Sequence, residues 1–339
     1  MDFKKILRKI TRIFIPLALG IVLLWYLYRN QDIGEMILVM RQNVNYNIIF
    51  FSLIFGLAAN VVRGLRWSML IDSLGKRVSR HNAIYAVLGN YAINMALPRV
   101  GEIWRCGAVA KYEKITFTKL LGTLFVDRIM DTLMVGLLTL CLCIFNIHFF
   151  KTFFSENPPL FIKAVWITAT SWWTYIVLVL IVAAVWYVFA KLKYLSVVQR
   201  VAEIFRNIWD GIKSLWKIEH KMRFGIQTLM IWGGYFLYFY ITFFAFDFTR
   251  DLGVRIALIA FAMSSIGVAV PVQGGIGVWH FMVISTLVAF GVNKTDAGAF
   301  ALVVFTIQSV WVVLVGFFGI VALAIRNKDE NEIKKSSND

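Results

Sequence analysis

Long apolar runs separated by shorter polar stretches form the main pattern along this chain. Several of these runs reach or exceed the roughly 17 residues that a helix needs to cross a membrane. We therefore predict an all-α integral membrane protein. Its about six full transmembrane helices are expected in residues 13–28, 46–62, 120–145, 172–190, 224–246 and 297–325.

Two further apolar stretches, 83–97 and 256–270, are short for a full crossing. Each stops at a proline followed by glycine, at Pro98 and at Pro271, and a second short apolar stretch follows, in 103–110 and 278–292. Irregular backbone at membrane depth is tolerated only where it is buried in protein or lines a polar cavity. We interpret each pair as a re-entrant hairpin broken by its proline and glycines, which gives eight helical membrane segments.

The order of span, broken hairpin and span occurs twice, in residues 46–145 and 224–325. The first copy enters the membrane from outside and the second from inside, which is the signature of an inverted-topology repeat. Paired breaks of this kind mark the binding site in many transporters. The alternative is that the two breaks are ordinary helix ends in a plain eight-span bundle.

Basic residues alternate along the connections between the spans. They are frequent at the N-terminus, in 63–119, in 191–223 and in the tail, and sparse in 29–45, 148–171 and 247–296. The positive-inside rule then places both termini in the cytoplasm. We expect one polytopic domain over 1–325 and a disordered cytoplasmic tail over 326–339.

Residues 195–217 carry a stripe of apolar residues at helical spacing, with basic residues off that stripe. This pattern is typical of an amphipathic helix that lies on the cytoplasmic membrane surface. A solvated linker helix that packs on the bundle is the alternative.

The composition agrees with the membrane assignment. Of the 339 residues, 60% are apolar and only 16% are charged, which excludes a soluble enzyme, a secreted disulfide scaffold and a disordered chain. The net charge of +16 is assigned to loops that meet anionic lipid, so no nucleic-acid partner is expected. The three cysteines are interpreted as small apolar residues, and no metal or other cofactor is expected.

Charged residues flank the first break. Glu102 and Arg105 are three positions apart and would share one face of a helix that starts after Pro98. The free N–H groups at such a helix start attract anions, and Arg99 and Arg105 would reinforce that attraction toward a phosphate headgroup. The alternative is a structural Glu102–Arg105 pair at the membrane interface.

A second charged group opens the third span. Asp127 and Asp131 share a helix face, and Arg128 can neutralise one of them. This group either lines a transport pathway or forms a structural ion pair at the membrane edge. Arg63 and Arg66 close the second span, as stop-transfer charges or as headgroup ligands.

The second break contains Gly274, Gly275 and Gly277, which would let the backbone approach a ligand closely. No phosphate-binding lysine follows, so this is not a nucleotide loop. His280 is either a titratable group of the site or a buried core histidine. Asn94, Gln273 and Gln308 could add uncharged polar contacts.

These motifs resemble a known family, the lysylphosphatidylglycerol synthase transmembrane region or flippase-like domain. The resemblance rests on Arg66-Trp67, Asn94-x-x-Leu97-Pro98-Arg99-x-Gly101-Glu102-x-x-Arg105, Asp127-Arg128-x-x-Asp131 and Pro271-x-x-Gly274-Gly275-x-Gly277. It implies a multi-pass protein of the bacterial cytoplasmic membrane that moves a lipid between leaflets.

The chain departs from the family pattern in places. His280 stands where the family often has a glutamate, and uncharged Thr306 or Gln308 stands where the last span often has an arginine. We also expect no cytoplasmic aminoacyltransferase domain, because only a short tail follows the last span.

The sequence therefore predicts a membrane lipid flippase, and not an enzyme, whose partner is an anionic or phosphate-bearing lipid such as a phospholipid or a polyprenyl-phosphate-linked lipid. One alternative is a non-catalytic subunit of a glycosyltransferase or envelope-lipid enzyme. A lipid-modifying membrane enzyme that uses Glu102 and His280 is another. The candidate substrate-binding residues are Arg66, Asn94, Arg99, Glu102, Arg105, Asp127, Arg128, Asp131, Gln273, Gly274, Gly275, Gly277 and His280.

Overall fold

The computed structural model describes residues 21–29, 31–147, 149–151, 196–213, 215–269 and 272–336. Within these ranges the chain is helical and forms no β-sheet, only an isolated bridge between Val44 and Phe246. Residues 21–28 are helical and precede the first labelled element. The labelled elements are α2 (Ile33–Gln42), α3 (Tyr46–Asp72), α4 (Arg80–Ala96), α5 (Val100–Glu113), α6 (Phe117–Phe145), α10 (Ser196–Lys213), α11 (Lys221–Tyr240), η1 (Ile241–Ala245), α12 (Asp247–Arg250), α13 (Gly253–Ala269), η2 (Gln273–Gly275), α14 (Val278–Ala289) and α15 (Lys294–Ser336).

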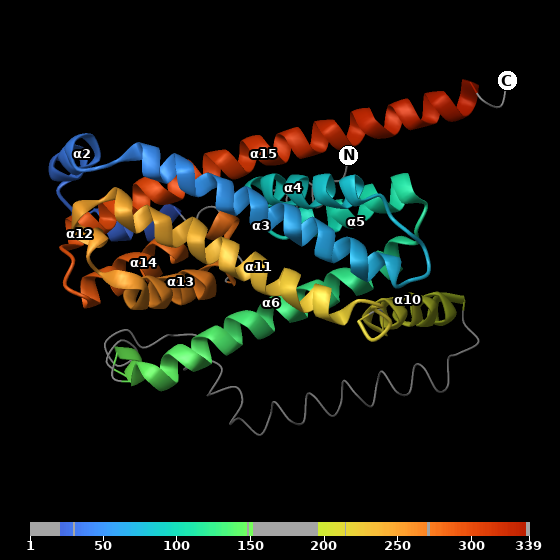
Figure 1. The fold of residues 1–339 in the computed structure, drawn as a ribbon, viewed down its shortest axis with the longest axis horizontal. Coiled ribbons are helices and arrows are strands. Elements are labelled where there is room, and N and C mark those ends of the chain that lie inside the picture. The colour runs from blue at the N-terminus through green and yellow to red at the C-terminus, as the bar shows by residue number, and fades with distance from the viewer. Residues whose placement is uncertain are drawn as a thin grey trace.

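Four elements are long and apolar enough to cross a membrane: α3, α6, α11 with η1, and α15 up to Lys328. They run lengthwise through the molecule (Figure 1). At 1.5 Å per residue, the 27 residues of α3 extend about 40 Å, more than the roughly 30 Å of a hydrocarbon core. Four of the six predicted spans correspond to these helices. The predicted span 172–190 and the first half of the span 13–28 lie outside the described residues.

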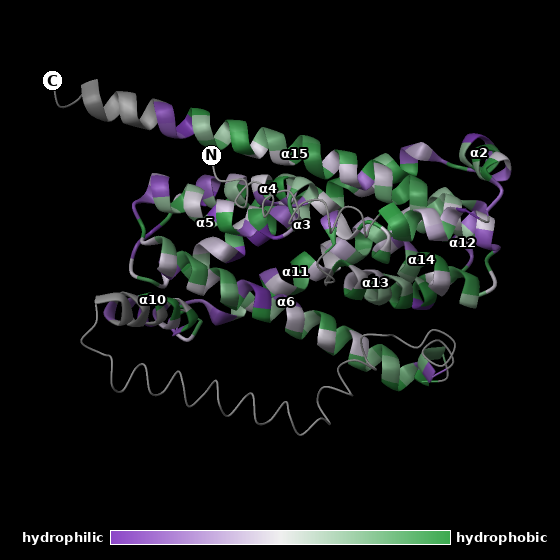
Figure 2. Cartoon of the chain, turned by 180° about the vertical axis from the view of Figure 1, so that it is seen from behind, coloured by the Kyte–Doolittle hydropathy of each residue, from purple (hydrophilic) through white to green (hydrophobic). Residues whose placement is uncertain are grey.

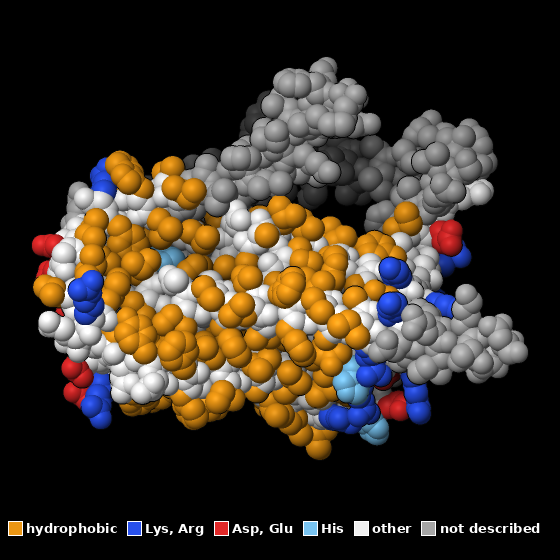
Figure 3. Space-filling view, turned by 90° about the horizontal axis from the view of Figure 1, so that it is seen from above, with side chains coloured by type: hydrophobic (Ala, Val, Ile, Leu, Met, Phe, Trp, Pro, Cys, Tyr) orange, Lys and Arg blue, Asp and Glu red, His pale blue; other side chains and the backbone are white. Residues whose placement is uncertain are grey.

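The surface of the molecule suits a hydrocarbon environment. Leu133, Leu137 and Leu140 on α6 are more than half exposed, as few leucines of a water-soluble domain would be. Hydrophobic side chains cover most of the face in Figure 3, and charged side chains gather at the two ends. Figure 2 shows the same distribution along the long helices, which are hydrophobic over much of their length.

Three boundaries differ from those predicted. The helix expected to end near residue 62 continues to Asp72, so Arg63 and Arg66 lie inside α3 and not in a loop. The last helix continues to Ser336, through residues 326–336 for which the sequence predicted disorder. Residues 33–42, which the sequence left as a connection, form α2, whose first turn is capped by the Asp32 carboxylate.

The short helices pair as two hairpins, α4 with α5 and α13 with α14, which lie toward opposite ends of the long axis (Figure 1). Each hairpin has its own apolar core. Trp67, Ala86 and Cys106 belong to the core around α4 and α5, and Phe261 and Phe300 belong to the core around α13 and α14.

The turns of the two hairpins touch each other. The side-chain amide of Gln273 donates to the carbonyl oxygens of Met95 and Ala96, at 3.1 and 2.7 Å, and so caps the last turn of α4. Gln273 of the second break therefore contacts the end of α4, directly before the first break. Pro271, at which the sequence places the second break, lies outside the described residues.

The first break has a tightly constrained backbone. Arg99 adopts a left-handed conformation, with φ of 65°, directly before α5. Two residues later, the Gly101 N–H donates to the side-chain oxygen of Asn94 at 2.9 Å. A Cβ atom at Gly101 would overlap the carbonyl oxygen of Asn90, so only glycine fits where α5 starts against α4.

The amphipathic segment predicted over 195–217 forms α10, which packs on the N-terminal part of α6. The two backbones come into direct contact at Gly122 and Gly211, where neither position has room for a Cβ atom. This contact favours a helix packed on the bundle. A role for α10 at the membrane surface stays a prediction.

Candidate functional site

A buried cluster of charged side chains joins α3, α5 and α6. Arg63 and Arg66 come from α3, Arg105 from α5, and Asp127 and Asp131 from α6. Arg66, Arg105 and Asp127 are fully buried, and Arg63 is 3% exposed. We refer to these five residues as the inner cluster.

Hydrogen bonds of short length hold the inner cluster together. Arg63 donates hydrogen bonds to both carboxylate oxygens of Asp131, to one of them at 3.1 Å. Arg66 bonds to Asp127 and, at 3.0 Å, to Asp131. Arg105 donates to the second oxygen of Asp127 at 2.9 Å. Both carboxylates therefore accept charge-assisted bonds from more than one arginine, and this explains how they are tolerated inside the protein.

Three more charged residues, Arg99, Glu102 and Arg128, form an outer rim that is more accessible. Arg99 is 54% exposed, Arg128 30% and Glu102 14%. Glu102 lies 3.8 Å from Arg99 and 3.5 Å from Arg128, which are ion-pair distances too long for good hydrogen bonds. The rim is therefore held more loosely than the inner cluster.

The cluster lies deep along its helices. Glu102 and Arg128 face each other, and each is eleven residues from the turn that joins α5 to α6, which corresponds to about 16 Å at helical rise. That is roughly half the thickness of a hydrocarbon core. Inner cluster and rim together contain five arginines and three carboxylates, so the eight side chains carry an excess of two positive charges.

Aromatic and hydroxyl side chains surround the inner cluster. The Arg105 guanidinium lies 4.6 Å from the ring centre of Trp67, whose indole N–H donates to Thr123. Arg66 also donates to Thr228 on α11, at 3.1 Å. Two of the Arg105 nitrogens, Nε and Nη1, are buried and have no hydrogen-bond partner among the described residues. Stacking on Trp67 offsets part of that cost.

A chain of hydroxyl groups leads from the cluster toward the centre of the bundle. Arg63 Nε donates to the Tyr235 hydroxyl at 3.2 Å, and Tyr235 donates to the Asn60 side-chain oxygen at 2.7 Å. The Tyr91 hydroxyl lies 3.0 Å from that of Tyr235. Polar contacts thus extend continuously from Asp131 to Asn60.

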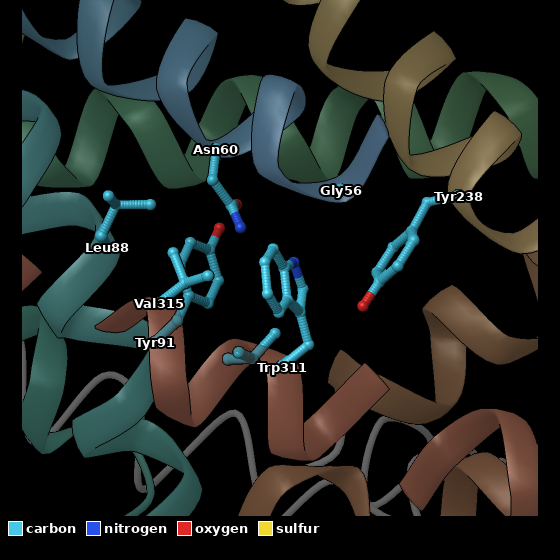
Figure 4. Close-up of a pocket in the computed structure, with 8 residues that line it drawn as sticks. Gly56, Asn60, Leu88, Tyr91, Tyr238, Trp311 and Val315 are labelled. Atoms are coloured by element: carbon cyan, nitrogen blue, oxygen red, sulfur yellow. The ribbon is translucent and has the colours of Figure 1, made fainter. Parts of the chain in front are cut away.

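This series of hydrogen-bonded side chains ends at a small cavity between α3, α4, α11 and α15 (Figure 4). Its volume is about 10 Å³, near the lower limit for one water molecule. The side chains of Asn60 and Tyr91 point toward each other across it, and the ring of Trp311 lies beside them. The Trp311 indole N–H has no acceptor within the described part of the chain.

The structure brings seven of the predicted site residues together: Arg66, Arg99, Glu102, Arg105, Asp127, Arg128 and Asp131. The Glu102–Arg105 pair, which was the alternative interpretation of these residues, is not formed. Arg105 turns toward Asp127 on α6, and Glu102 faces Arg99 and Arg128 instead. Arg105 is also fully buried, although its local sequence does not predict a position in the core.

The other predicted residues lie apart from the cluster. Asn94 and Gln273 organise the two breaks, through the bonds to Gly101 and to the end of α4. Gly274 and Gly275, within η2, and Gly277, directly before α14, all have positive φ, which explains the glycines without invoking a ligand. Gln308 donates to the Tyr238 carbonyl oxygen.

His280 is a buried histidine in an aromatic environment. It is 1% exposed, and the rings of Phe305, Trp279 and Tyr28 lie 4.5, 5.5 and 6.2 Å from its own. These contacts support the interpretation as a core histidine. A role of His280 in ligand binding stays a prediction.

Sequence reasoning left Arg63, Tyr235, Tyr91 and Asn60 out of the candidate site. A signal for Arg63 existed, because Arg63 and Arg66, three residues apart, share one helix face, as do Asp127 and Asp131, four residues apart on another helix. The tyrosines and Asn60 carry no such signal, since their importance depends on hydrogen bonds between distant helices. Within the described residues, no group of three His, Cys, Asp or Glu side chains could hold a metal ion.

Comparisons with known proteins give one result. A sequence family described as "Lysylphosphatidylglycerol synthase TM region" matches residues 13–316 of this chain. No curated protein and no solved structure matches it.

Proposed function

Because the chain belongs to the family of the lysylphosphatidylglycerol synthase TM region, and is therefore a multi-pass integral membrane protein, we propose that it moves a lipid between the two leaflets. The proposed cargo is a lipid with an anionic or phosphate-bearing headgroup. The observation that supports this best is the charge cluster, with its excess of two positive charges inside helices α3, α5 and α6. The enzyme activity of relatives named as synthases is not assigned to this chain.

The physical need for such a cluster supports this proposal. Moving a charged group to the bilayer centre costs about 2.5–3.5 kcal/mol on insertion scales, and a flippase must lower that cost for the headgroup. Arginines that are already held inside the protein would donate hydrogen bonds to the headgroup phosphate, and these bonds would replace the ones that the phosphate makes with water. Apolar residues beside the rim, such as Ile103 and Phe125, are more than half exposed and could contact the acyl chains.

The arrangement of the hairpins supports an alternating-access mechanism. We propose that α3–α6 and α11–α15 are inverted repeats, each with a re-entrant hairpin, α4–α5 and α13–α14 respectively. The contact of Gln273 with the end of α4 would then be the point where the two repeats meet. Rocking of one repeat against the other at this contact would expose the cluster to each leaflet in turn.

This proposal includes an orientation in the bacterial cytoplasmic membrane, with both termini inside. Two exposed residues at opposite expected sides test it: Asp251 outside and Lys217 inside. In a variant whose native cysteines are replaced by alanine, a cysteine at Asp251 should react with an impermeant thiol reagent applied to intact cells. A cysteine at Lys217 should react only after permeabilisation, and the opposite pattern would contradict the orientation.

The two alternative functions have less support. A lipid-modifying enzyme would need Glu102 and His280 to act together, yet Glu102 faces arginines and His280 is enclosed by aromatic rings. A non-catalytic subunit of a glycosyltransferase or envelope-lipid enzyme remains the second candidate. It predicts no lipid movement by the isolated protein.

A transport assay on the purified protein tests the proposal directly. Vesicles containing the protein and a trace of fluorescent phosphatidylglycerol are treated with a quencher that cannot cross the membrane. We expect faster loss of inner-leaflet fluorescence than in protein-free vesicles, and little acceleration for fluorescent diacylglycerol, which has no phosphate. Equal rates with and without the protein would contradict the transport proposal.

The variant Arg128→Gln gives the residue-level control for this assay. Loss of one hydrogen bond to a charged group costs about 1.5–3 kcal/mol, so transport should fall roughly 10- to 150-fold. Arg255→Gln removes an equally charged, exposed side chain from the start of α13 and should leave the rate unchanged. Equal effects of the two variants would show that the outer rim has no specific role in transport.

A further inference from the structure

The outer rim is built differently from the inner cluster, and this difference carries a further inference. Every carboxylate oxygen that Arg128 faces lies 3.5–3.6 Å away, on Asp127, Asp131 and Glu102. Good guanidinium–carboxylate hydrogen bonds are about 2.7–2.9 Å long. Arg128 Nε is buried and has no hydrogen-bond partner among the described residues. The Arg128 guanidinium therefore retains capacity to bind another anion.

Glu102 is the carboxylate best placed to be exchanged. Asp127 and Asp131 accept hydrogen bonds from the inner arginines at distances such as 2.9 and 3.1 Å, whereas the two ion pairs of Glu102 are 3.5 and 3.8 Å long. Glu102 lies in the first turn of α5, a 14-residue helix. A carboxylate there is stabilised by the positive end of the helix dipole, so it can leave the arginines without losing all of its compensation.

The surroundings of the outer rim indicate which kind of anion would bind there. Val100 and Ile103 on α5, and Phe125 on α6, are 41%, 57% and 52% exposed beside the charged residues. A soluble anion would gain nothing from these apolar side chains, whereas the tails of a lipid would. The surroundings thus favour a phosphate that is attached to hydrocarbon.

We propose that Glu102 is a built-in competing anion: its carboxylate occupies Arg99 and Arg128 when the site is empty, and a lipid phosphate displaces it on binding. Like charges prevent the carboxylate and the phosphate from sharing the two guanidinium groups. When the headgroup leaves, Glu102 returns to the arginines and opposes rebinding. Glu102 thereby sets how tightly the lipid is held. This inference rests on the proposed function, whose cargo it specifies as a phosphate-bearing lipid.

The decisive variant is Glu102→Gln, which keeps the size of the side chain and removes its charge. Binding of fluorescent phosphatidylglycerol to the purified protein in detergent is measured by fluorescence anisotropy. We expect the Kd to fall about tenfold, because the competing charge is gone. Transport in vesicles should slow at the same time, because Glu102 no longer opposes rebinding and the lipid is released more slowly. Glu35→Gln, which removes an exposed charge from α2, should change neither.

Each other outcome overturns the inference. An unchanged Kd would mean that Glu102 does not compete, and a weaker affinity would mean that it contributes to binding or holds the site together. Thermal unfolding of the variant distinguishes a contribution to binding, which leaves stability unchanged, from a structural role, which lowers it. Inorganic phosphate added at millimolar concentration should not displace the fluorescent lipid. If it competes as well as the lipid does, the ligand is free phosphate and the lipid assignment is wrong.

A measurement on the unsubstituted protein covers the case in which Glu102→Gln does not fold. A water-soluble carbodiimide and an amine modify accessible carboxylates, and mass spectrometry locates the product. Addition of phosphatidylglycerol should increase modification of Glu102 severalfold and leave Asp127 unmodified. No increase would overturn the inference. Because lipid binding is read separately from transport, a protein that binds with these signatures but moves no lipid would contradict only the proposed function.

Discussion

Replacement of Asp127 by asparagine is expected to lower the free energy of unfolding by about 3–5 kcal/mol, the largest effect that we expect from a single change. Asp127 is fully buried and accepts bonds from Arg66 and Arg105. An asparagine keeps the volume but removes the negative charge, which leaves three uncompensated positive charges where there were two. The measurement is thermal unfolding of the purified protein in detergent.

Two further variants make the Asp127 result specific. Asp251→Asn changes an exposed aspartate at the end of α12 and should alter stability by less than about 0.5 kcal/mol. Arg105→Met, added to Asp127→Asn, removes one of the uncompensated positive charges and should restore part of the lost stability. If Asp127→Asn is as stable as the unsubstituted protein, the inner cluster does not hold these helices together.

Replacement of Gly101 by alanine is expected to be the most damaging change of a single methyl group. The added carbon would overlap the Asn90 carbonyl oxygen, so α5 would have to move away from α4. Overpacking of this kind costs about 1–3 kcal/mol, and here the obstacle is backbone, which cannot rotate aside. Because Glu102 follows directly, the outer rim would be displaced, and lipid transport should fall together with stability.

Gly107→Ala is the matched control on the same helix. A Cβ atom at Gly107 meets nothing within 4 Å, and alanine in a helix interior is favoured over glycine by about 0.5–1 kcal/mol. This variant should be as stable as the unsubstituted protein or slightly more stable. Comparable losses at both positions would indicate that helix propensity, and not the close approach at the first break, governs this hairpin.

Local signals explain why much of the fold could be predicted from the sequence. Apolar runs of sufficient length identified α3, α6, α11 and α15, because backbone groups in hydrocarbon can be satisfied only within a helix. Pro98 and the glycines of the second break identified the interruptions. The contact between the two breaks, through Gln273, is seen only in the structure.

The extent of the helices was less predictable, because it depends on partners elsewhere in the chain. Arg63 and Arg66 ended the predicted span, since isolated arginines are unfavourable at membrane depth. In the structure α3 continues past both, because Asp127 and Asp131, about sixty residues later, accept their hydrogen bonds. A local rule on charge could not anticipate this compensation.

The sequence by itself determined which residue types could form the candidate site, and only the tertiary structure decided how they pair. Spacing along one helix suggested Glu102 with Arg105, yet Arg105 binds Asp127 on α6 and Glu102 faces Arg128. The reason is physical. An ion pair between residues three or four apart on one helix stabilises the protein by only a few tenths of a kcal/mol. A charge that is buried between helices without a partner is far more costly. The packing of α3, α5 and α6 therefore outweighs local spacing, and it separates a fixed inner cluster from a rim that can exchange its anion.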